Sequence, residues 1–287
     1  MKQRVLTAAL LIPPVLLAVF LSSFWPFFVL SAIVLVLSYR EVAALANSRF
    51  PVSLIGVLAL LLILARKESF DSFWAAHPTL FGGLAEPWWL AQKNMLSLCL
   101  GVQVIGAIAC LRLVCGWRGF FAGELCSLWL LSGICSLVLS RPDRYRDSFS
   151  LGDVAGSVLL CLLPIWVGDT IAIFVGKAWG KHSLAPKISP KKTVEGAIAN
   201  LVGCLVTSIG LAELIGQPLL VGVLVGLATG VLGQLGDLLE SAMKRSAGVK
   251  DSGKLLPGHG GLLDRIDSIL LSAPAVALIV VTLGNRA

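Results

Sequence analysis

The sequence predicts an all-α polytopic membrane protein that crosses the bilayer about nine times, with its N-terminus in the cytoplasm. Of its 287 residues, 57% are hydrophobic and only 14% are charged, whereas soluble domains carry about 25% charged residues. Several apolar runs reach the ~20 residues that a helix needs to cross about 30 Å of hydrocarbon. The sequence lacks the strict alternation of an outer-membrane barrel. We therefore expect a multi-pass helical protein of the cell membrane, meaning the inner or plasma membrane.

The apolar runs place each expected span. They lie at about 5–21, 24–39, 51–65, 95–115, 121–140, 153–176, 195–215, 218–240 and 263–283. The first run follows a basic tip like that of a signal peptide. It is long, contains two prolines and lacks a clear cleavage site, so we expect it to be retained as a helix. We divide the chain into N-terminal helices over 1–150, about five spans, and C-terminal helices over 151–287.

The distribution of Lys and Arg predicts the orientation. With nine spans and the N-terminus inside, 16 of the 23 basic residues fall in cytoplasmic segments, as the positive-inside rule requires. The long cytoplasmic loops, 180–194 and 241–262, both belong to the C-terminal half. A Trp-rich loop at 66–94 falls on the outer side, where tryptophan suits the membrane interface. The seven cysteines lie in or beside apolar runs without metal-binding spacing, so we expect small buried side chains.

Carboxylates lie near the inner ends of the last two spans, where burial is costly and a functional role is expected. Asp237 lies near the inner end of the eighth run, and Glu240 and Ser241 follow it at helical i,i+3 and i,i+4 spacing. The start of the ninth run carries Asp264 and Asp267, again at i,i+3 spacing. Because these two spans run antiparallel, we expect their inner ends to meet and the carboxylates to lie close together.

Clustered carboxylates in a medium of low dielectric constant repel one another and need a counter-charge. Carboxylate and hydroxyl oxygens are hard ligands that suit Mg²⁺, which proteins commonly hold with one or two carboxylates together with substrate phosphates. Cations lie beside the cluster in the sequence, at Lys191, Lys192, Lys244, Arg245, Lys250 and Lys254. Glycines at 248, 253, 258, 260 and 261 let backbone N–H groups approach an anion closely. Together these residues predict a metal–polyphosphate site.

Two other interpretations compete with this one. A positive-inside loop that only orients helices and contacts anionic lipid accounts for the cations, but it leaves Asp251, Asp264 and Asp267 unexplained. An ion-coupled transporter would use intramembrane carboxylates, with Asp169 inside the sixth run as its carrier. A transporter more naturally places its charges near the midplane. Here most charges lie at one face, which favours chemistry on a lipid head group.

Two segments carry a resemblance to a known family. The first is SAMKRSAGVKDSGKLLPGHGGLLDRID, residues 241–267, and the second is GDTIAIFVGKAWGKHSLAPKISPKKTVEG, residues 168–196. Both resemble the motifs of the phosphatidate cytidylyltransferases, also called CDP-diacylglycerol synthases. The first segment matches without a departure, and in the second Ile173 takes the place of the usual aromatic residue. The resemblance covers residues 150–270, and the N-terminal half is similar only in being apolar.

The resemblance implies an enzyme of phospholipid biosynthesis that transfers CMP from CTP to phosphatidate, giving CDP-diacylglycerol and pyrophosphate. It implies catalysis by the C-terminal half at the cytoplasmic leaflet, a divalent metal and a homodimer. We expect one or two Mg²⁺ ions, with a monovalent cation as a further candidate, and no nucleic-acid partner.

The resemblance also gives the site residues their expected roles. The lipid phosphate would attack the α-phosphate of CTP in line, with assistance from metal held by Asp237, Asp264 and Asp267. Ser241 and Lys192 complete the expected catalytic group. The residues expected to bind substrate are Lys191, Ser189, Thr193, Lys244, Arg245, Lys250, Asp251, His259, Gly260, Gly261, Arg265 and Asp169. The choice for His259 between phosphate and loop stays open, as does the choice for Asp169 between a lysine and metal.

Overall fold

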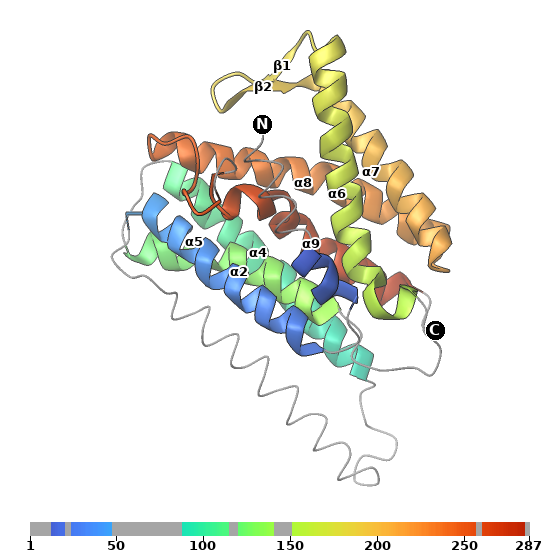
Figure 1. The fold of residues 1–287 in the computed structure, drawn as a ribbon. Coiled ribbons are helices and arrows are strands. Elements are labelled where there is room, and N and C mark those ends of the chain that lie inside the picture. Colours follow the sequence, from blue (N-terminus) through green and yellow to red (C-terminus); the bar gives the residue numbers. More distant parts are fainter. Residues whose placement is uncertain are drawn as a thin grey trace.

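The structure is a computed structural model that describes residues 13–20, 24–47, 88–114, 120–140, 151–256 and 260–284. Most of these residues belong to long helices (Figure 1). The helices are α2 (Phe24–Leu45), α4 (Trp88–Val114), α5 (Phe120–Ser140), α6 (Leu151–Trp179), α7 (Val194–Leu214), α8 (Leu219–Ser246) and α9 (Leu263–Leu283). Residues 13–20 are also helical. Between α6 and α7 the chain forms an antiparallel hairpin of two short strands, β1 (Ser183–Ala185) and β2 (Ser189–Thr193).

The helical class predicted from the sequence is confirmed, while the number of spans is confirmed only in part. Five of the described helices, α2, α6, α7, α8 and α9, are long and apolar enough to cross a membrane. The apolar parts of α4 and α5 are shorter. The expected spans at 5–21 and 51–65 and the loop at 66–94 lie wholly or largely outside the described residues. The count of about nine spans and the cytoplasmic N-terminus therefore stay predictions.

α2 and α8 extend past the C-terminal ends of their expected apolar runs, and this changes where site residues lie. α2 continues to Leu45, and α8 continues to Ser246, so the start of the expected 241–262 loop is helical. Lys244 and Arg245 lie in the last turn of α8, where positive charge interacts favourably with the helix dipole. Two residues after the helix ends, Gly248 has a φ of 73°, which lets Val249 N donate to Lys244 O in a Schellman arrangement.

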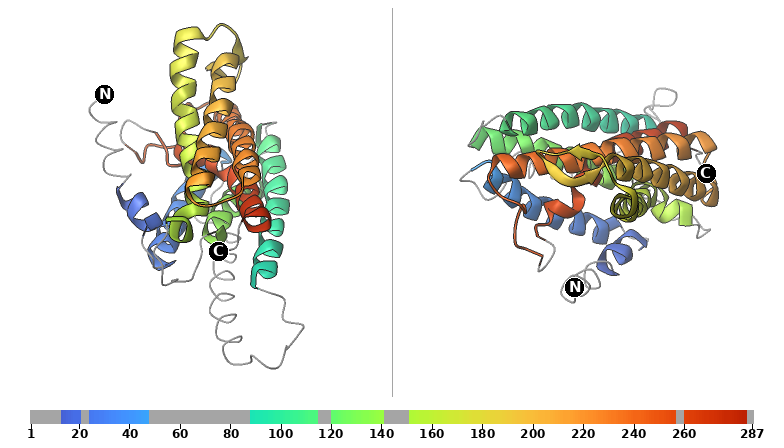
Figure 2. Two further views of the ribbon diagram at one scale, coloured as in Figure 1. Left: turned by 90° about the vertical axis from the view of Figure 1, so that its right-hand side faces the viewer. Right: turned by 90° about the horizontal axis from the view of Figure 1, so that it is seen from above.

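α9 lies at the centre of the bundle. It packs extensively on α8 and also contacts α2, α4, α5 and α6. α6 and α7 pack on each other along their length, and with the hairpin they project beyond the ends of the other helices (Figures 1 and 2). The six described cysteines are free, and five of them are buried, as the sequence predicted. The core therefore forms around the helix that carries Asp264 and Asp267.

Close approach of α8 and α9 brings their polar ends together. At Gly236 of α8, a Cβ atom would come 2.5 Å from the carbonyl oxygen of Asp267 and 3.2 Å from Leu271 Cβ. Any larger side chain would push the two helices apart, because neither the backbone nor a packed β-carbon can yield. A glycine is thus required one residue before Asp237, at the point where the carboxylates meet.

A buried hydrogen bond from another helix replaces the backbone hydrogen bond that α9 lacks at Pro274. Proline has no N–H, so Leu270 O lacks its usual donor four residues ahead. Gln103 of α4 supplies the missing donor, with Nε2 2.9 Å from Leu270 O, and Ser132 of α5 hydrogen-bonds to the other end of the same amide. Three helices are thereby joined inside an apolar core.

Replacing Gln103 with Leu should therefore destabilise the bundle by about 1–3 kcal/mol, because it leaves a buried carbonyl without a donor. The Pro274→Ala variant restores an N–H for Leu270 O. In that background the same Gln103→Leu change should cost about 1 kcal/mol less. Thermal or denaturant unfolding of the four proteins in detergent measures the coupling. Equal costs in both backgrounds would show that Gln103 does not substitute for the missing proline donor.

Candidate functional site

A cavity of about 1380 Å³ lies among the helices. Part of its wall is apolar and comes from α2, α5 and α6, including Phe27, Leu30, Val34, Ile134, Leu137, Leu162 and Ile165. The polar residues of the wall come from α6, β2, α7, α8, α9 and the loop between α8 and α9, and include Asp169, Lys191, Lys192, Asn200, Gln234, Asp237, Lys244, Asp251, Asp264, Arg265 and Asp267. A cavity that combines an apolar wall with many charges suits an amphipathic ligand.

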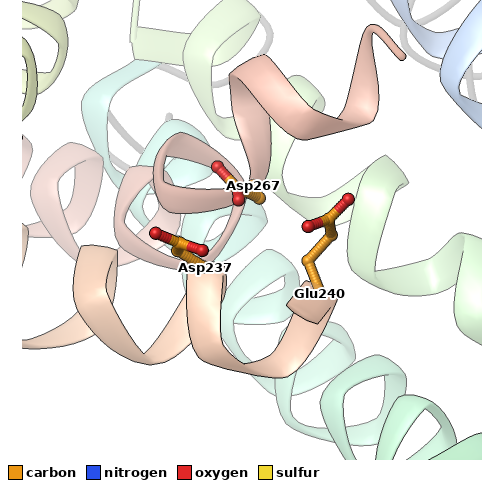
Figure 3. A group of neighbouring side chains, drawn as sticks. All are labelled: Asp237, Glu240 and Asp267. Carbon is orange, nitrogen blue, oxygen red and sulfur yellow. The ribbon is translucent and has the colours of Figure 1, made fainter. Parts of the chain in front are cut away.

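Three carboxylates meet between α8 and α9, and two of them, Asp237 and Asp267, line this cavity. Asp237, Glu240 and Asp267 each offer one oxygen, and these oxygens lie within 4.8 Å of one another. Figure 3 shows Asp237 and Glu240 on one helix and Asp267 on its neighbour. Glu240 is fully buried, Asp267 is 8% exposed and Asp237 is half-buried. The antiparallel meeting that the sequence predicted is therefore present for Asp237 and Asp267.

Two lysines partly neutralise the carboxylates. Lys192 of β2 lies 2.5 Å from Asp237 Oδ2. Lys244, one turn after Glu240 on α8, forms an ion pair with Glu240, and its Nζ lies 2.5 Å from Asp264 Oδ1. Three of the four carboxylates thus engage two lysines in direct pairs, so the carboxylates outnumber the lysines that pair with them.

The donor set fits a hard divalent cation. The oxygens of Glu240 are buried and, among the described residues, make no hydrogen bond besides the ion pair with Lys244. Buried oxygens of this kind need a further partner, and carboxylate oxygens at this spacing are suitable ligands for Mg²⁺. Ser241 Oγ, 3.3 Å from Asp237 Oδ1, orients that carboxylate from the next turn of α8. The described residues could therefore hold a metal through Asp237, Glu240 and Asp267.

Asp264 lies beside this trio and holds the loop that precedes α9. Its Oδ2 accepts hydrogen bonds from Gly261 N at 2.7 Å and from Ser252 N and Oγ, both at 3.1 Å. Gly260 has a φ of 84°, and a Cβ there would come 2.7 Å from Asp264 Oδ2. Both the backbone conformation and the space require glycine at this position. The structure thus places Gly260 and Gly261 around a carboxylate of the chain itself.

Asp169 of α6 belongs to a chain of polar side chains in the same cavity. Asn200 of α7 donates to Asp169 Oδ1 at 2.9 Å, and Gln234 of α8 donates to Asn200 Oδ1 at 3.2 Å. Amides can donate and accept at once, so the three side chains satisfy one another across three helices. For the question left open by the sequence, the structure pairs Asp169 with an amide.

The other predicted site residues, on and near the hairpin, differ in whether they line the cavity. Thr193 caps α7 through a hydrogen bond from Gly196 N to its Oγ1 at 3.1 Å. Arg245 donates to Ile188 O and Val249 O, which fixes the hairpin turn to the end of α8. The cavity is also lined by Lys191 of β2, Asp251 of the loop after α8 and Arg265 of α9. Ser189 lies on β2 half-buried, Lys250 is exposed, and His259 lies outside the described residues.

Sequence reasoning missed four polar residues and gave a fifth no role. Asn200 and Gln234 lie inside apolar runs, and polar side chains inside a span are themselves a signal of function. Glu41 was missed because its apolar run was ended at 39, six residues too early. Ser252 gave no signal in the sequence. Glu240 was noticed as a helical neighbour of Asp237 but was not assigned to metal.

The chain is similar to known proteins over nearly its whole length. Residues 2–283 match the model of a family described as the cytidylyltransferase family. A Haemophilus influenzae protein named phosphatidate cytidylyltransferase is 33% identical over 293 residues, which cover 96% of both chains. A Bacillus subtilis protein of the same name is 48% identical over 120 residues, 41% of this chain and 44% of its own. A Staphylococcus aureus protein of that name is 44% identical over 126 residues, 43% of this chain and 48% of its own.

The two lysines should differ in their effect on stability. Lys244→Met leaves Glu240 buried without its cation, so we expect a loss of about 3–5 kcal/mol. Lys192→Met removes the same charge from a half-exposed pair, for which a loss of about 0–1 kcal/mol is expected. Unfolding in detergent measures both. If the two variants lose the same stability, Lys244 does not neutralise a buried charge.

Proposed function

Since this chain belongs to the cytidylyltransferase family, we propose that it transfers CMP from CTP to phosphatidate, giving CDP-diacylglycerol and pyrophosphate. The observation that carries this proposal is the cavity in which carboxylates of α8 and α9 and two lysines lie next to an apolar wall. Phosphatidate needs both surfaces, because its acyl chains are apolar and its phosphate is charged. The nucleotide needs the charged surface for its triphosphate.

The apolar wall of the cavity would position the lipid substrate. Side chains of α2, α5 and α6 would contact the acyl chains, and the lipid phosphate would then reach the polar residues of α8 and α9. Holding both substrates in one cavity makes their reaction effectively unimolecular, which is a large part of the rate enhancement of such a transfer. The N-terminal half would thus contribute to lipid binding together with α6, while the C-terminal half carries the charged groups.

The reaction joins two polyanions, so electrostatic stabilisation is the main task of the residues. An oxygen of the lipid phosphate forms a bond to the α-phosphorus of CTP. The bond from that phosphorus to the oxygen bridging to the β-phosphate breaks, and pyrophosphate leaves with the electron pair. Lys191, Lys192, Lys244 and Arg265 line the cavity and would bind phosphate oxygens. Lys192 and Lys244 would exchange carboxylate partners for substrate oxygens.

The ligand set proposed for Mg²⁺ is Asp237, Glu240 and Asp267, with Asp264 retained as a further ligand. Ser241 keeps Asp237 oriented through its hydrogen bond. When bound, the metal would neutralise charge that develops on the phosphoryl oxygens during transfer. One or two ions and a monovalent cation remain compatible with this donor set.

The remaining expectations belong to the same proposal. The active site would face the cytoplasm at the cell membrane, where CTP is available, and the enzyme would act as a homodimer. Ser189, Lys250, Asp251, Gly260, Gly261 and His259 remain proposed contacts of the substrates, and Thr193 and Arg245 would act by fixing the hairpin. The ion-coupled transporter considered above receives no support from the relatives, whose names are those of an enzyme.

A mixed-micelle assay tests the proposal. Purified protein should release pyrophosphate and form CDP-diacylglycerol only when CTP, phosphatidate and Mg²⁺ are all present, because the chemistry needs one compartment only. Omitting each component in turn is the control, and EDTA should stop the reaction. No lipid product under these conditions, together with ion-driven uptake into sealed vesicles, would favour the transporter.

A further inference from the structure

Glu41 of α2 is a buried carboxylate that does not line the cavity. Its exposed fraction is 7%, and its neighbours Tyr39, Val42, Ala43 and Leu45 belong to a hydrophobic cluster of buried side chains. A carboxylate in such surroundings is costly to bury unless hydrogen bonds compensate it. Its partners therefore indicate what the residue is for.

The partners of Glu41 belong to the loop before α9 and to the first residue of α9. Leu262 N donates to Oε1 at 2.9 Å, and Leu263 N donates to Oε2 at 2.7 Å. Ser252 Oγ lies 2.9 Å from the same Oε2. These donors lie 211 to 222 residues further along the chain. One side chain of α2 thus collects three hydrogen bonds from the opposite end of the sequence.

The hydrogen bonds act as a helix cap supplied by another helix. α9 begins at Leu263, and its N-cap residue, Leu262, has no side chain able to accept the free backbone N–H groups. Ser, Thr, Asp or Asn usually does this from the N-cap position itself. Glu41 takes over that role, and its charge also interacts favourably with the positive end of the helix dipole.

Two glycines of the segment make room for Glu41. At Gly253 a Cβ would come 2.5 Å from Glu41 Oε1 and 3.0 Å from its Cδ. At Gly261 a Cβ would come 2.5 Å from Oε2 and would also overlap Ser252 Oγ. The sequence suggested that these glycines admit an anion, and in the structure the anion beside both of them is the carboxylate of Glu41.

Glu41 is connected to the charged site through one residue. Ser252 Oγ lies between two carboxylates, 2.9 Å from Glu41 Oε2 and 3.1 Å from Asp264 Oδ2. Asp264 Oδ1 in turn binds Lys244, the cation that pairs with Glu240. The start of α9 also sets the positions of Asp264 and Asp267, which are its second and fifth residues.

We propose that Glu41 is a positioning residue for nucleotidyl transfer: by fixing segment 260–262 and the start of α9, it places Asp264 and Asp267 against the substrate phosphates. Its effect on turnover rests on the proposed function, whereas its effect on the segment does not. Through Glu41, the N-terminal half takes a direct part in organising the charged site.

The test compares Glu41→Gln and Glu41→Leu with the wild-type chain. Glutamine keeps one acceptor oxygen and the shape of the side chain, while leucine keeps none. Glu213→Gln is the matched control, because Glu213 is an exposed carboxylate of α7 outside the site. Each protein is measured for CMP transfer per folded molecule, for melting temperature in detergent, and for hydrogen exchange over residues 260–266.

Turnover per folded molecule should fall about 10-fold in Glu41→Gln and about 100-fold in Glu41→Leu. Exchange over residues 260–266 should become at least about tenfold faster, while peptides of α7 keep their protection. A residue that only stabilises the fold would lower the melting temperature and leave turnover per folded molecule unchanged. That result, or wild-type turnover and protection in Glu41→Leu, would overturn the proposal.

Gly253→Ala provides a second test that keeps Glu41 in place, in case Glu41→Leu does not fold. The added methyl group should displace the segment from the carboxylate, with faster exchange over 260–266 and slower turnover. Wild-type behaviour of Gly253→Ala and Glu41→Gln together contradicts the proposal. If the wild-type chain transfers no CMP, the proposed function fails, and hydrogen exchange still decides whether Glu41 holds the segment.

Discussion

The need to stabilise four carboxylates between two packed helices governs the architecture of this site. Asp237, Glu240, Asp264 and Asp267 come together where α8 and α9 approach closely, in an interior with little water to screen their charge. Two lysines neutralise part of this charge, and a bound metal ion would neutralise more of it. Close packing of α8 and α9 thus brings like charges together, which is unfavourable. Hydrogen bonds from the surrounding residues offset part of this cost.

The surrounding structure can be understood as support for this cluster. The turn at Gly260 and the backbone of Gly261 enclose Asp264, and the hairpin brings Lys192 to Asp237. Gln103 keeps α9 continuous past Pro274. The cavity is lined from both sides of the boundary at residue 150, because α2 and α5 supply part of its apolar wall and the segments from α6 to α9 supply the remainder and the charges. Lipid binding and phosphate chemistry therefore share one space.

Much of this arrangement could be predicted from the sequence, for physical reasons that differ between residues. Helical spacing and the antiparallel order of the last two spans were enough to bring Asp237 near Asp267, because both rules act locally. The hairpin was expected only as a loop, since strands of three and five residues carry too little alternation to be recognised. Glu41 could not be placed, because its partners lie more than 200 residues away. Contacts at that distance in sequence depend on how the whole bundle packs.

Equilibrium binding of Mn²⁺, followed by electron paramagnetic resonance on the purified protein in detergent, tests the central claim most directly. Mn²⁺ replaces Mg²⁺ at oxygen ligands, and binding does not depend on turnover. Wild-type protein should bind the ion saturably, and Asp267→Asn should weaken that binding at least about 10-fold. Asp251→Asn, which alters an exposed carboxylate of the same cavity, should bind as the wild type does. Unchanged Mn²⁺ binding in Asp267→Asn would contradict the account.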